Sequence, residues 1–151
     1  MIVGTGSIAK VLTDRDDVTF FASGVSDSSC INYEKFNRER NLLLSQPKNK
    51  HIVYFSSIGI YTGQNTYIQH KRDMESLIKD QFVSYTIVRI ECIEWGKAPN
   101  TIQNYFRRMI NENKPVQILN IFRYVVSLEE FLYWMNIIPV GEKNEMNILG
   151  T

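Results

Sequence analysis

Tyr67 and Lys71 lie four residues apart in the segment TYIQHK, and these two side chains together can do acid–base chemistry. Residues four apart share one face of a helix, so the lysine ammonium can lie beside the phenol. A nearby cation favours the phenolate and lowers the pKa of tyrosine from about 10. Such a tyrosine can exchange a proton with a substrate oxygen during hydride transfer, and the hydroxyl of Ser57 can hold that same oxygen. The spacing alone also fits two residues that are merely neighbours on a helix. The rest of the sequence must show which of the two interpretations applies.

A glycine turn, GTGSIA, occupies residues 4–9, after a short apolar run and before a predicted helix. In such a turn Gly4 permits a sharp bend, and Gly6 lets the backbone approach a diphosphate. Ala9 lets the helix pack near the strand, and the helix N-terminus offers free N–H groups to the phosphates. Ser7 can add its hydroxyl. Two glycines alone are weak support, but this turn lies at the first strand–helix junction, where a Rossmann-type site belongs.

The elements that must position these residues alternate along the chain. Apolar, β-branched and aromatic runs predict strands over residues 1–3, 18–23, 51–57, 84–90 and 145–151, with short β-like pieces at 115–119 and 123–127. Helical patterns cover residues 7–12, 32–44, 67–79, 102–113 and 129–135, with Asn100 or Thr101 capping the fourth. Alternating strands and helices predict an α/β fold of Rossmann-like type. Its sheet is mainly parallel, with helices on both faces.

The adenosine half of a dinucleotide site is incomplete. Such a site usually has an acidic residue about 20 residues after the turn, at the end of the second strand. Here only TDRDD separates the first predicted helix from the strand at residues 18–23. The chain therefore lacks the usual second and third strands.

Composition excludes several classes of protein. The chain has 151 residues, 44% of them hydrophobic, and a net charge of +1, which predicts a single domain over residues 1–151. Like charges form no block, so we expect no nucleic-acid partner. Cys30 and Cys92 are far apart and His51 and His70 are the two histidines, so we expect free thiols and no metal site. No signal peptide or membrane span is evident, and we expect a cytoplasmic protein with no membrane partner.

Several segments in order resemble the extended short-chain dehydrogenase/reductase superfamily, in particular its NAD-dependent epimerase/dehydratase group acting on nucleotide sugars. FASGVSDSS resembles the segment after the family's fourth strand, and FNRERNLLL resembles the helix that follows it. YFSSIGIYTG resembles the strand end with the catalytic hydroxyl, and YIQHK matches Tyr-x-x-x-Lys. IVRIECIEWG, FRYVVSLEEF and MNILGT resemble later family segments.

The resemblance implies an NAD(P)-dependent oxidoreductase or epimerase of surface-polysaccharide biosynthesis, with NAD or NADP as cofactor and a nucleotide sugar as substrate. It implies catalytic roles for Ser57, Tyr67 and Lys71. The cofactor-binding residues that it implies are Gly4, Gly6, Ser7, Ile8, Ala22, Ser23, Gly24, Tyr67 and Lys71. The substrate-binding residues that it implies are Ser57, Tyr61 and Arg123.

The sequence also departs from the family. The glycine motif is GxGxxA instead of GxxGxxG, the loop between Ser57 and Tyr67 is short, and tyrosine follows Arg123 where the family has aspartate. The sequence stops where the family usually continues into a substrate-binding lobe. A catalytically inactive module that binds NAD(P) or a nucleotide sugar, as a sensor or scaffold, is therefore the alternative hypothesis.

Other residues receive structural interpretations. Arg89 lies inside an apolar strand, and we expect an ion pair with Glu91 or Glu94. Arg123 fits a phosphate contact or a surface position equally, and His70 is expected to face solvent. We expect core or interface positions for Trp95, Tyr105, Phe106 and Trp134. The missing strands leave the first strand at an exposed edge, which predicts a homodimer or a covering segment there.

Overall fold

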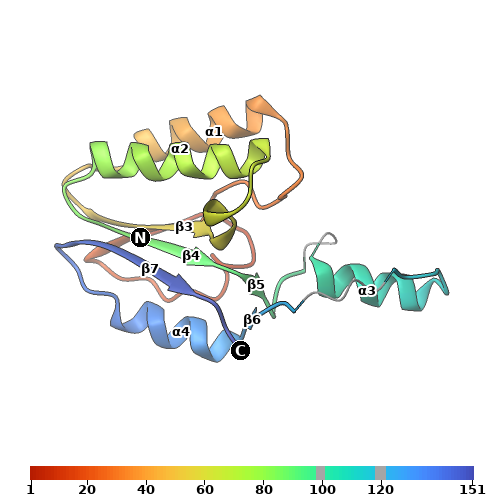
Figure 1. The fold of residues 1–151 in the computed structure, drawn as a ribbon. Coiled ribbons are helices and arrows are strands. Elements are labelled where there is room, and N and C mark those ends of the chain that lie inside the picture. The colour runs from red at the N-terminus through yellow and green to blue at the C-terminus, as the bar shows by residue number, and fades with distance from the viewer. Residues whose placement is uncertain (98–100, 118–121) are drawn as a thin grey trace.

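The computed structural model describes residues 1–97, 101–117 and 122–151. Within them, five strands form one sheet in the order β1-β2-β3-β4-β7, and every neighbouring pair is parallel (Figure 1). The strands are β1 (Ile2–Val3), β2 (Val18–Phe21), β3 (His51–Ser57), β4 (Tyr85–Ile90) and β7 (Lys143–Ile148). The predicted α/β, Rossmann-like fold with a mainly parallel sheet is confirmed.

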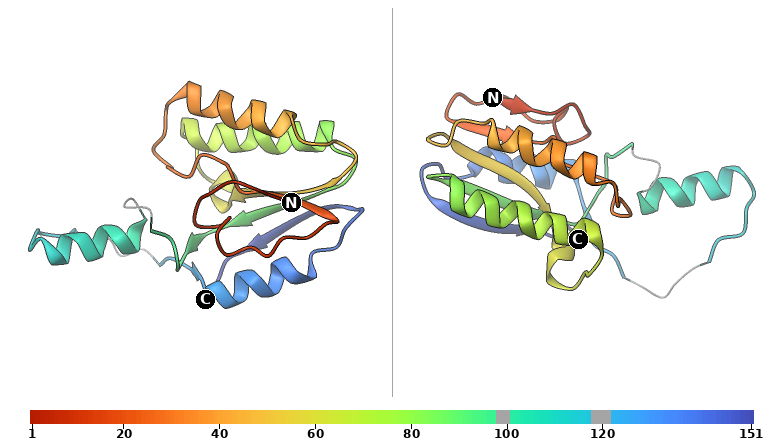
Figure 2. Two further views of the ribbon diagram at one scale, coloured as in Figure 1. Left: turned by 180° about the vertical axis from the view of Figure 1, so that it is seen from behind. Right: turned by 90° about the horizontal axis from the view of Figure 1, so that it is seen from above.

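Helices cover both faces of this sheet. α1 (Tyr33–Leu44) and α2 (Thr66–Gln81) lie side by side on one face, and α4 (Leu128–Ile137) lies on the other (Figures 1 and 2). Because both faces are covered, a central strand must be apolar throughout, and β3 is buried along its length up to Ser57.

The alternation of side chains along the strands divides the core in two. Val53 and Phe55 of β3 face α4, whereas Ile52 and Tyr54 face α1 and α2 and pack in one cluster with Leu43. This packing fixes the helices against the sheet. The loops at the carboxyl ends of the strands therefore start from a rigid sheet.

A projecting part leaves the body after β4. β5 (Cys92–Ile93) pairs in parallel with β6 (Val125–Val126), and α3 (Ile102–Asn111), between them in sequence, extends away from the sheet (Figures 1 and 2). Thr101 caps α3, because its Oγ1 accepts a hydrogen bond from the backbone N of Asn104 at 3.3 Å. Asn100, the other predicted cap, lies outside the described residues.

Two predicted elements differ in the structure. The helix predicted over residues 7–12 is wrong, because residues 7–11 form turns, with two backbone hydrogen bonds: Lys10 N donates to the Gly6 carbonyl at 3.1 Å, and Val11 N donates to the Ile8 carbonyl at 3.2 Å. A six-residue helix gains too few hydrogen bonds to offset its nucleation, and Ala9 is its one buried residue. The strand predicted over 115–119 is not formed by residues 115–117, and residues 118 and 119 lie outside the described residues.

β1 is the outer strand at one edge of the sheet, as the missing second and third strands predict. A homodimer through this edge stays a prediction. Among the described residues, no helix combines the length and the apolar character that crossing a membrane requires.

Candidate active site

Ser57 ends β3 at the carboxyl edge of the sheet, where open α/β sheets bind their ligands. Its Oγ accepts a hydrogen bond from the backbone N of Gly59 at 3.1 Å and so caps the short 3₁₀ helix η1 (Ile58–Tyr61). η1 packs closely on α2, since a Cβ on Gly59 would lie 2.6 Å from Cδ1 of Ile68. Ser57 is therefore held next to the first turn of α2.

α2 carries Tyr67 and Lys71 one turn apart, as predicted. The helix begins after Asn65, whose Oδ1 accepts a hydrogen bond from the backbone N of Ile68 at 2.8 Å. Lys71 Nζ lies 5.7 Å from the centroid of the Tyr67 ring, a cation–π contact. Both residues are buried, and Tyr67 packs in a cluster with Val25 of the loop after β2.

The ammonium of Lys71 is held by Glu39 of α1, a residue that the sequence analysis missed. Lys71 Nζ lies 3.2 Å from Oε1 of Glu39 and donates to the hydroxyl of Tyr54 at 3.1 Å. That hydroxyl in turn donates to the same Oε1 at 2.7 Å. Glu39 is 0% exposed and Lys71 2% exposed, so this is a fully buried ion pair.

The second carboxylate oxygen of Glu39 is also occupied. Oε2 accepts hydrogen bonds from Nε2 of His70 at 2.9 Å and from the backbone N of Val25 at 2.8 Å. Burial on its own would raise the pKa of Glu39, but Lys71, His70 and the other donors outweigh it and lower the pKa from 4.5 to about 2. The carboxylate is therefore ionised at neutral pH, and its hydrogen bonds tie α1, α2, β3 and the loop after β2 together.

The rings of Phe36 and Tyr54 complete this cluster around Glu39. The expectation that His70 faces solvent is wrong: it is buried, and its ring stacks on Phe36 with the centroids 4.3 Å apart. Full burial and the negative charge of Glu39 raise the pKa of Tyr54 well above 10, so its phenol stays protonated and remains a donor to Glu39.

The position of Glu39 in the sequence indicates that its carboxylate is buried. It lies on the same face of α1 as the buried Phe36 and Leu43, three residues after one and four before the other. A carboxylate on the buried face of a helix needs a cationic partner, because an isolated buried charge is very costly. That requirement predicts a buried lysine, arginine or protonated histidine opposite, but the sequence does not say which one.

The loop after β2 closes over Lys71. A Cβ on Gly24 would lie 2.8 Å from Lys71 Nζ, so this position has room for glycine alone unless the lysine moves. Arg38 of α1 donates to the carbonyl of Ser23 at 3.2 Å and to its Oγ at 2.8 Å. A pocket of about 300 Å³ lies beside this loop, lined by Gly24, Val25, Ser26, Asp27, Lys35 and Arg38. Gly24, one of the predicted cofactor-binding residues, is thus next to the predicted catalytic lysine, and Ser23, another, contacts Arg38.

The glycine turn lies against the same loop. Gly4 has φ +134°, and a Cβ there would lie 2.3 Å from the carbonyl oxygen of Ala22, so glycine is required. Gly6 has no heavy atom within 4 Å of its Cβ position, which leaves open space on that side of the turn. The carbonyl of Ser7 accepts a hydrogen bond from Nε1 of Trp95 at 3.1 Å. Because residues 7–11 form turns, the helix N-terminus that the spacing predicted for a diphosphate is not formed.

Tyr61, the predicted substrate-side tyrosine, ends η1 with an exposed ring. Its hydroxyl accepts a hydrogen bond from Nη1 of Arg89 at 3.0 Å and donates to Oδ1 of Asn147 at 3.1 Å. Two polar side chains therefore fix the phenol, while its ring remains accessible.

Arg89 forms an ion pair, as predicted, but not with Glu91 or Glu94. Its Nε and Nη2 contact the two carboxylate oxygens of Glu75 on α2 at 3.0 and 2.7 Å, and Nη2 also lies 2.6 Å from Glu145 of β7. Arg89 points to the α2 face of the sheet, whereas Glu91 and Glu94 follow the end of β4.

Arg123 is not part of the buried cluster. It is half exposed and lies 3.9 Å from the carboxylate of Glu91, which follows β4 at the carboxyl edge.

Trp95 packs against the core beside Phe131, as its predicted core position requires. In the described part of the chain, no group of three or more His, Cys, Asp or Glu side chains is placed to hold a metal ion.

Comparison with known proteins supports the fold. No protein-family model matches this sequence, and no curated protein is significantly similar to it. One similar solved structure is the capsular polysaccharide assembling protein CapF from Staphylococcus aureus, with a TM-score of 0.53 and 19% identity. Another is the UDP-N-acetylglucosamine 4-epimerase from Methanobrevibacter ruminantium M1 in complex with UDP-N-acetylmuramic acid, with a TM-score of 0.59 and 13% identity.

The likeness extends over most of this chain but over only part of the other two. It covers 85% of this chain and 39% of CapF, and 93% of this chain and 56% of the epimerase. These two structures therefore share the Rossmann-like fold of this chain, and the chain spans 39% and 56% of their lengths.

Proposed function

We propose that this chain acts on a nucleotide sugar as an NAD(P)-dependent epimerase, dehydratase or reductase domain of surface-polysaccharide biosynthesis. The observation that carries the proposal is the placement of Tyr67 and Lys71 one turn apart on α2, whose first turn packs against η1, the short helix that Ser57 caps at the carboxyl end of β3. The similar epimerase, which has a nucleotide sugar bound, and CapF, a capsular polysaccharide protein, support the substrate class.

Each catalytic residue has a role in this proposal. Tyr67 exchanges a proton with a hydroxyl or keto oxygen of the sugar, and the ammonium of Lys71 lies over its ring. Ser57 holds the same oxygen through its hydroxyl. On the substrate side, Tyr61 offers its exposed ring and Arg123 a cation for phosphate.

The residues present fit the nicotinamide part of NAD or NADP best, and the glycine turn can contact the diphosphate through its backbone without a helix N-terminus. Gly4 brings the glycine turn against Ala22, and Gly6 leaves open space at its Cβ position. Gly24 lies beside Lys71, and Ser23, the residue before it, is hydrogen-bonded to Arg38. We assign Gly4, Gly6, Ser7, Ile8, Ala22, Ser23, Gly24, Tyr67 and Lys71 to cofactor binding. The bound cofactor would supply the hydride acceptor or donor.

We assign the protein to the cytoplasm as a single NAD(P)-binding domain over residues 1–151.

The experiment is calorimetry of the purified protein with NAD⁺, NADH, NADP⁺ and NADPH in turn, followed by a nucleotide-sugar turnover screen. We expect micromolar binding of one oxidised and reduced pair, and loss of turnover by about 100-fold or more in Tyr67→Phe. Tyr33→Phe, which alters an exposed tyrosine on α1, is the matched control. Absence of binding by all four dinucleotides would refute the oxidoreductase proposal.

A second candidate function has a specific observation in its favour. The ammonium of Lys71 is neutralised by Glu39 and buried under the Gly24 loop, so neither a ribose hydroxyl nor solvent reaches it unless that loop moves. This arrangement suits a module that binds a dinucleotide or a nucleotide sugar without turnover. Binding of a UDP-sugar at micromolar concentration, with no hydride transfer to any dinucleotide, would favour this module over the enzyme.

A further inference from the structure

α3 has an apolar face with no fully buried side chain among the residues that the structure describes. Its apolar residues recur with the spacing i, i+3, i+4, i+7 and i+8, which is the pattern of a helix that packs against a partner. They are Ile102, Tyr105, Phe106, Met109 and Ile110. None of them is buried, Ile110 is 68% exposed, and the helix projects from the body (Figures 1 and 2).

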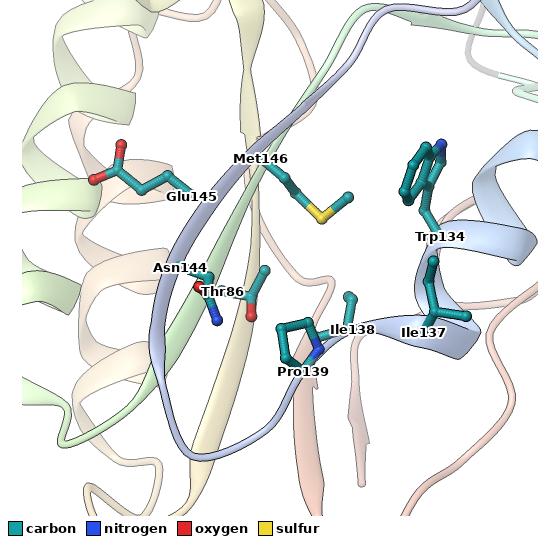
Figure 3. Close-up of a pocket in the computed structure, with 8 residues that line it drawn as sticks. All are labelled: Thr86, Trp134, Ile137, Ile138, Pro139, Asn144, Glu145 and Met146. Carbon is teal, nitrogen blue, oxygen red and sulfur yellow. The ribbon is translucent and has the colours of Figure 1, made fainter.

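α4 also has apolar side chains exposed on its outer surface. Phe131 and Met135 turn inward to the core, whereas Tyr133, Trp134 and Ile137 are exposed on the other side. Next to them, between the end of α4 and the start of β7, is a mainly apolar pocket of about 220 Å³ (Figure 3). The pocket is lined by Thr86, Trp134, Ile137, Ile138, Pro139, Asn144, Glu145 and Met146.

The pocket also has an unused hydrogen-bond donor. Nδ2 of Asn144 is buried and has no partner among the described residues. A buried donor without a partner is costly, so a docked side chain that brings an acceptor is favoured there. Tyr105 of α3 carries such an acceptor in its hydroxyl.

The charges of the two helices are complementary. α3 contains Arg107 and Arg108 and no acidic residue, whereas α4 contains Glu129 and Glu130 and no basic one. The arginines lie toward the C-terminal end of α3 and the glutamates in the first turn of α4. Antiparallel packing therefore places arginines opposite glutamates, and it places the N-terminal half of α3, with Tyr105, over the pocket at the C-terminal end of α4.

We propose that two copies of this chain associate reciprocally, with α3 of each copy packed antiparallel on α4 of the other. Within one chain α3 points away from α4, as both views of Figure 2 show, so it reaches the α4 surface of a second copy instead. A two-fold axis then uses the same pair of surfaces twice, which closes the assembly at a dimer. This interface is separate from the β1 edge and from the candidate active site.

The test is analytical ultracentrifugation from 1 to 100 µM with two charge-reversed proteins. One carries Arg107→Glu and Arg108→Glu, and the other carries Glu129→Lys and Glu130→Lys. In either protein alone, both contacts of a dimer bring like charges together, and we expect the dissociation constant to rise at least about tenfold. In an equimolar mixture both contacts have opposite charges again, so a mixed dimer of nearly wild-type affinity is expected.

An apolar pair of variants tests the same contact independently. Ile110→Asp is expected to abolish the dimer over this concentration range, whereas Val83→Asp, at an exposed valine between α2 and β4, leaves it unchanged. Circular dichroism checks that each variant is folded. If the lysine variant does not fold, the arginine reversals and Ile110→Asp still test the α3 surface.

Two results overturn the proposal. One is a wild-type protein that remains monomeric up to 100 µM. The other is a dimer whose dissociation constant is the same in the wild type, in both charge-reversed proteins and in Ile110→Asp, as a dimer through the β1 edge would be.

Discussion

Replacing Glu39 by glutamine tests the buried ion pair directly. The change preserves the shape of the side chain but leaves the ammonium of Lys71 buried without a counter-charge. Breaking a buried pair in this way typically destabilises a protein by about 3–5 kcal/mol. A fall of the Glu39 pKa from 4.5 to about 2 corresponds to about 3 kcal/mol at pH 7, which agrees with that range.

The pH dependence follows from the direction of the shift. The pKa of Glu39 is lower in the folded than in the unfolded protein, so its stabilisation is complete above about pH 4.5. It is lost as the pH falls toward 2, and roughly 2 kcal/mol has gone by pH 3. The difference in free energy of unfolding between the wild type and Glu39→Gln should therefore narrow between pH 6 and pH 3.

The assay is urea unfolding followed by circular dichroism at pH 7, 5 and 3. Glu34→Gln is the matched control, because Glu34 is on the same helix but exposed, and it should change stability by less than about 1 kcal/mol. A double variant, Glu39→Gln with Lys71→Met, removes both charges and should recover much of the loss. If Glu39→Gln unfolds at the same urea concentration as the wild type at pH 7, or if the difference does not narrow in acid, the reasoning is refuted.

Two further predictions concern the glycine turn and His51. Gly4→Ala should destabilise the protein by about 2–4 kcal/mol because of the positive φ at Gly4 and the contact with Ala22. Gly6→Ala should change stability by less than about 1 kcal/mol yet weaken dinucleotide binding. Equal urea midpoints for the two variants would contradict this. Burial and the charge of Arg15 lower the pKa of His51, although Asp17 opposes them. Below about pH 6.5 the unfolded chain therefore binds a proton that the folded chain resists, and stability falls. His51→Gln should lose less stability than the wild type between pH 6.5 and 5.5 in urea titrations, and parallel curves would contradict this.

The main strands and helices were predictable because their patterns are local. β3 has an apolar run between His51 and the two serines at its end, as expected of a strand covered on both faces, and β3 is found at the predicted residues 51–57. α1 and α2 were predicted to within a few residues from their helical periodicity, whereas the structure alone identifies Asn32 and Asn65 as the residues that cap them. The turns at residues 7–11 were missed because a short apolar segment has the same composition whether or not a helix forms.

The candidate site was predictable only where its residues are close in sequence. Tyr67 and Lys71 lie on one helix, so their contact follows from the spacing. Glu39 and His70 meet although they are far apart in sequence, because α1 and α2 pack side by side on the sheet. That contact depends on tertiary packing, so the sequence pattern placed His70 in solvent and left the counter-charge of Lys71 unidentified.

The position of β7 has a consequence for how the chain folds. β7 pairs with β4, so that Tyr85 lies beside Lys143 and Ile90 beside Ile148, with β5, α3, β6 and α4 between them in sequence. Closing so long a loop costs entropy before its contacts form, and folds dominated by such pairings form slowly. Until β7 arrives, β4 is an open edge and the core under α4 lacks Ile148. A nascent chain that has not yet supplied residues 143–148 is therefore the species most exposed to aggregation through β4.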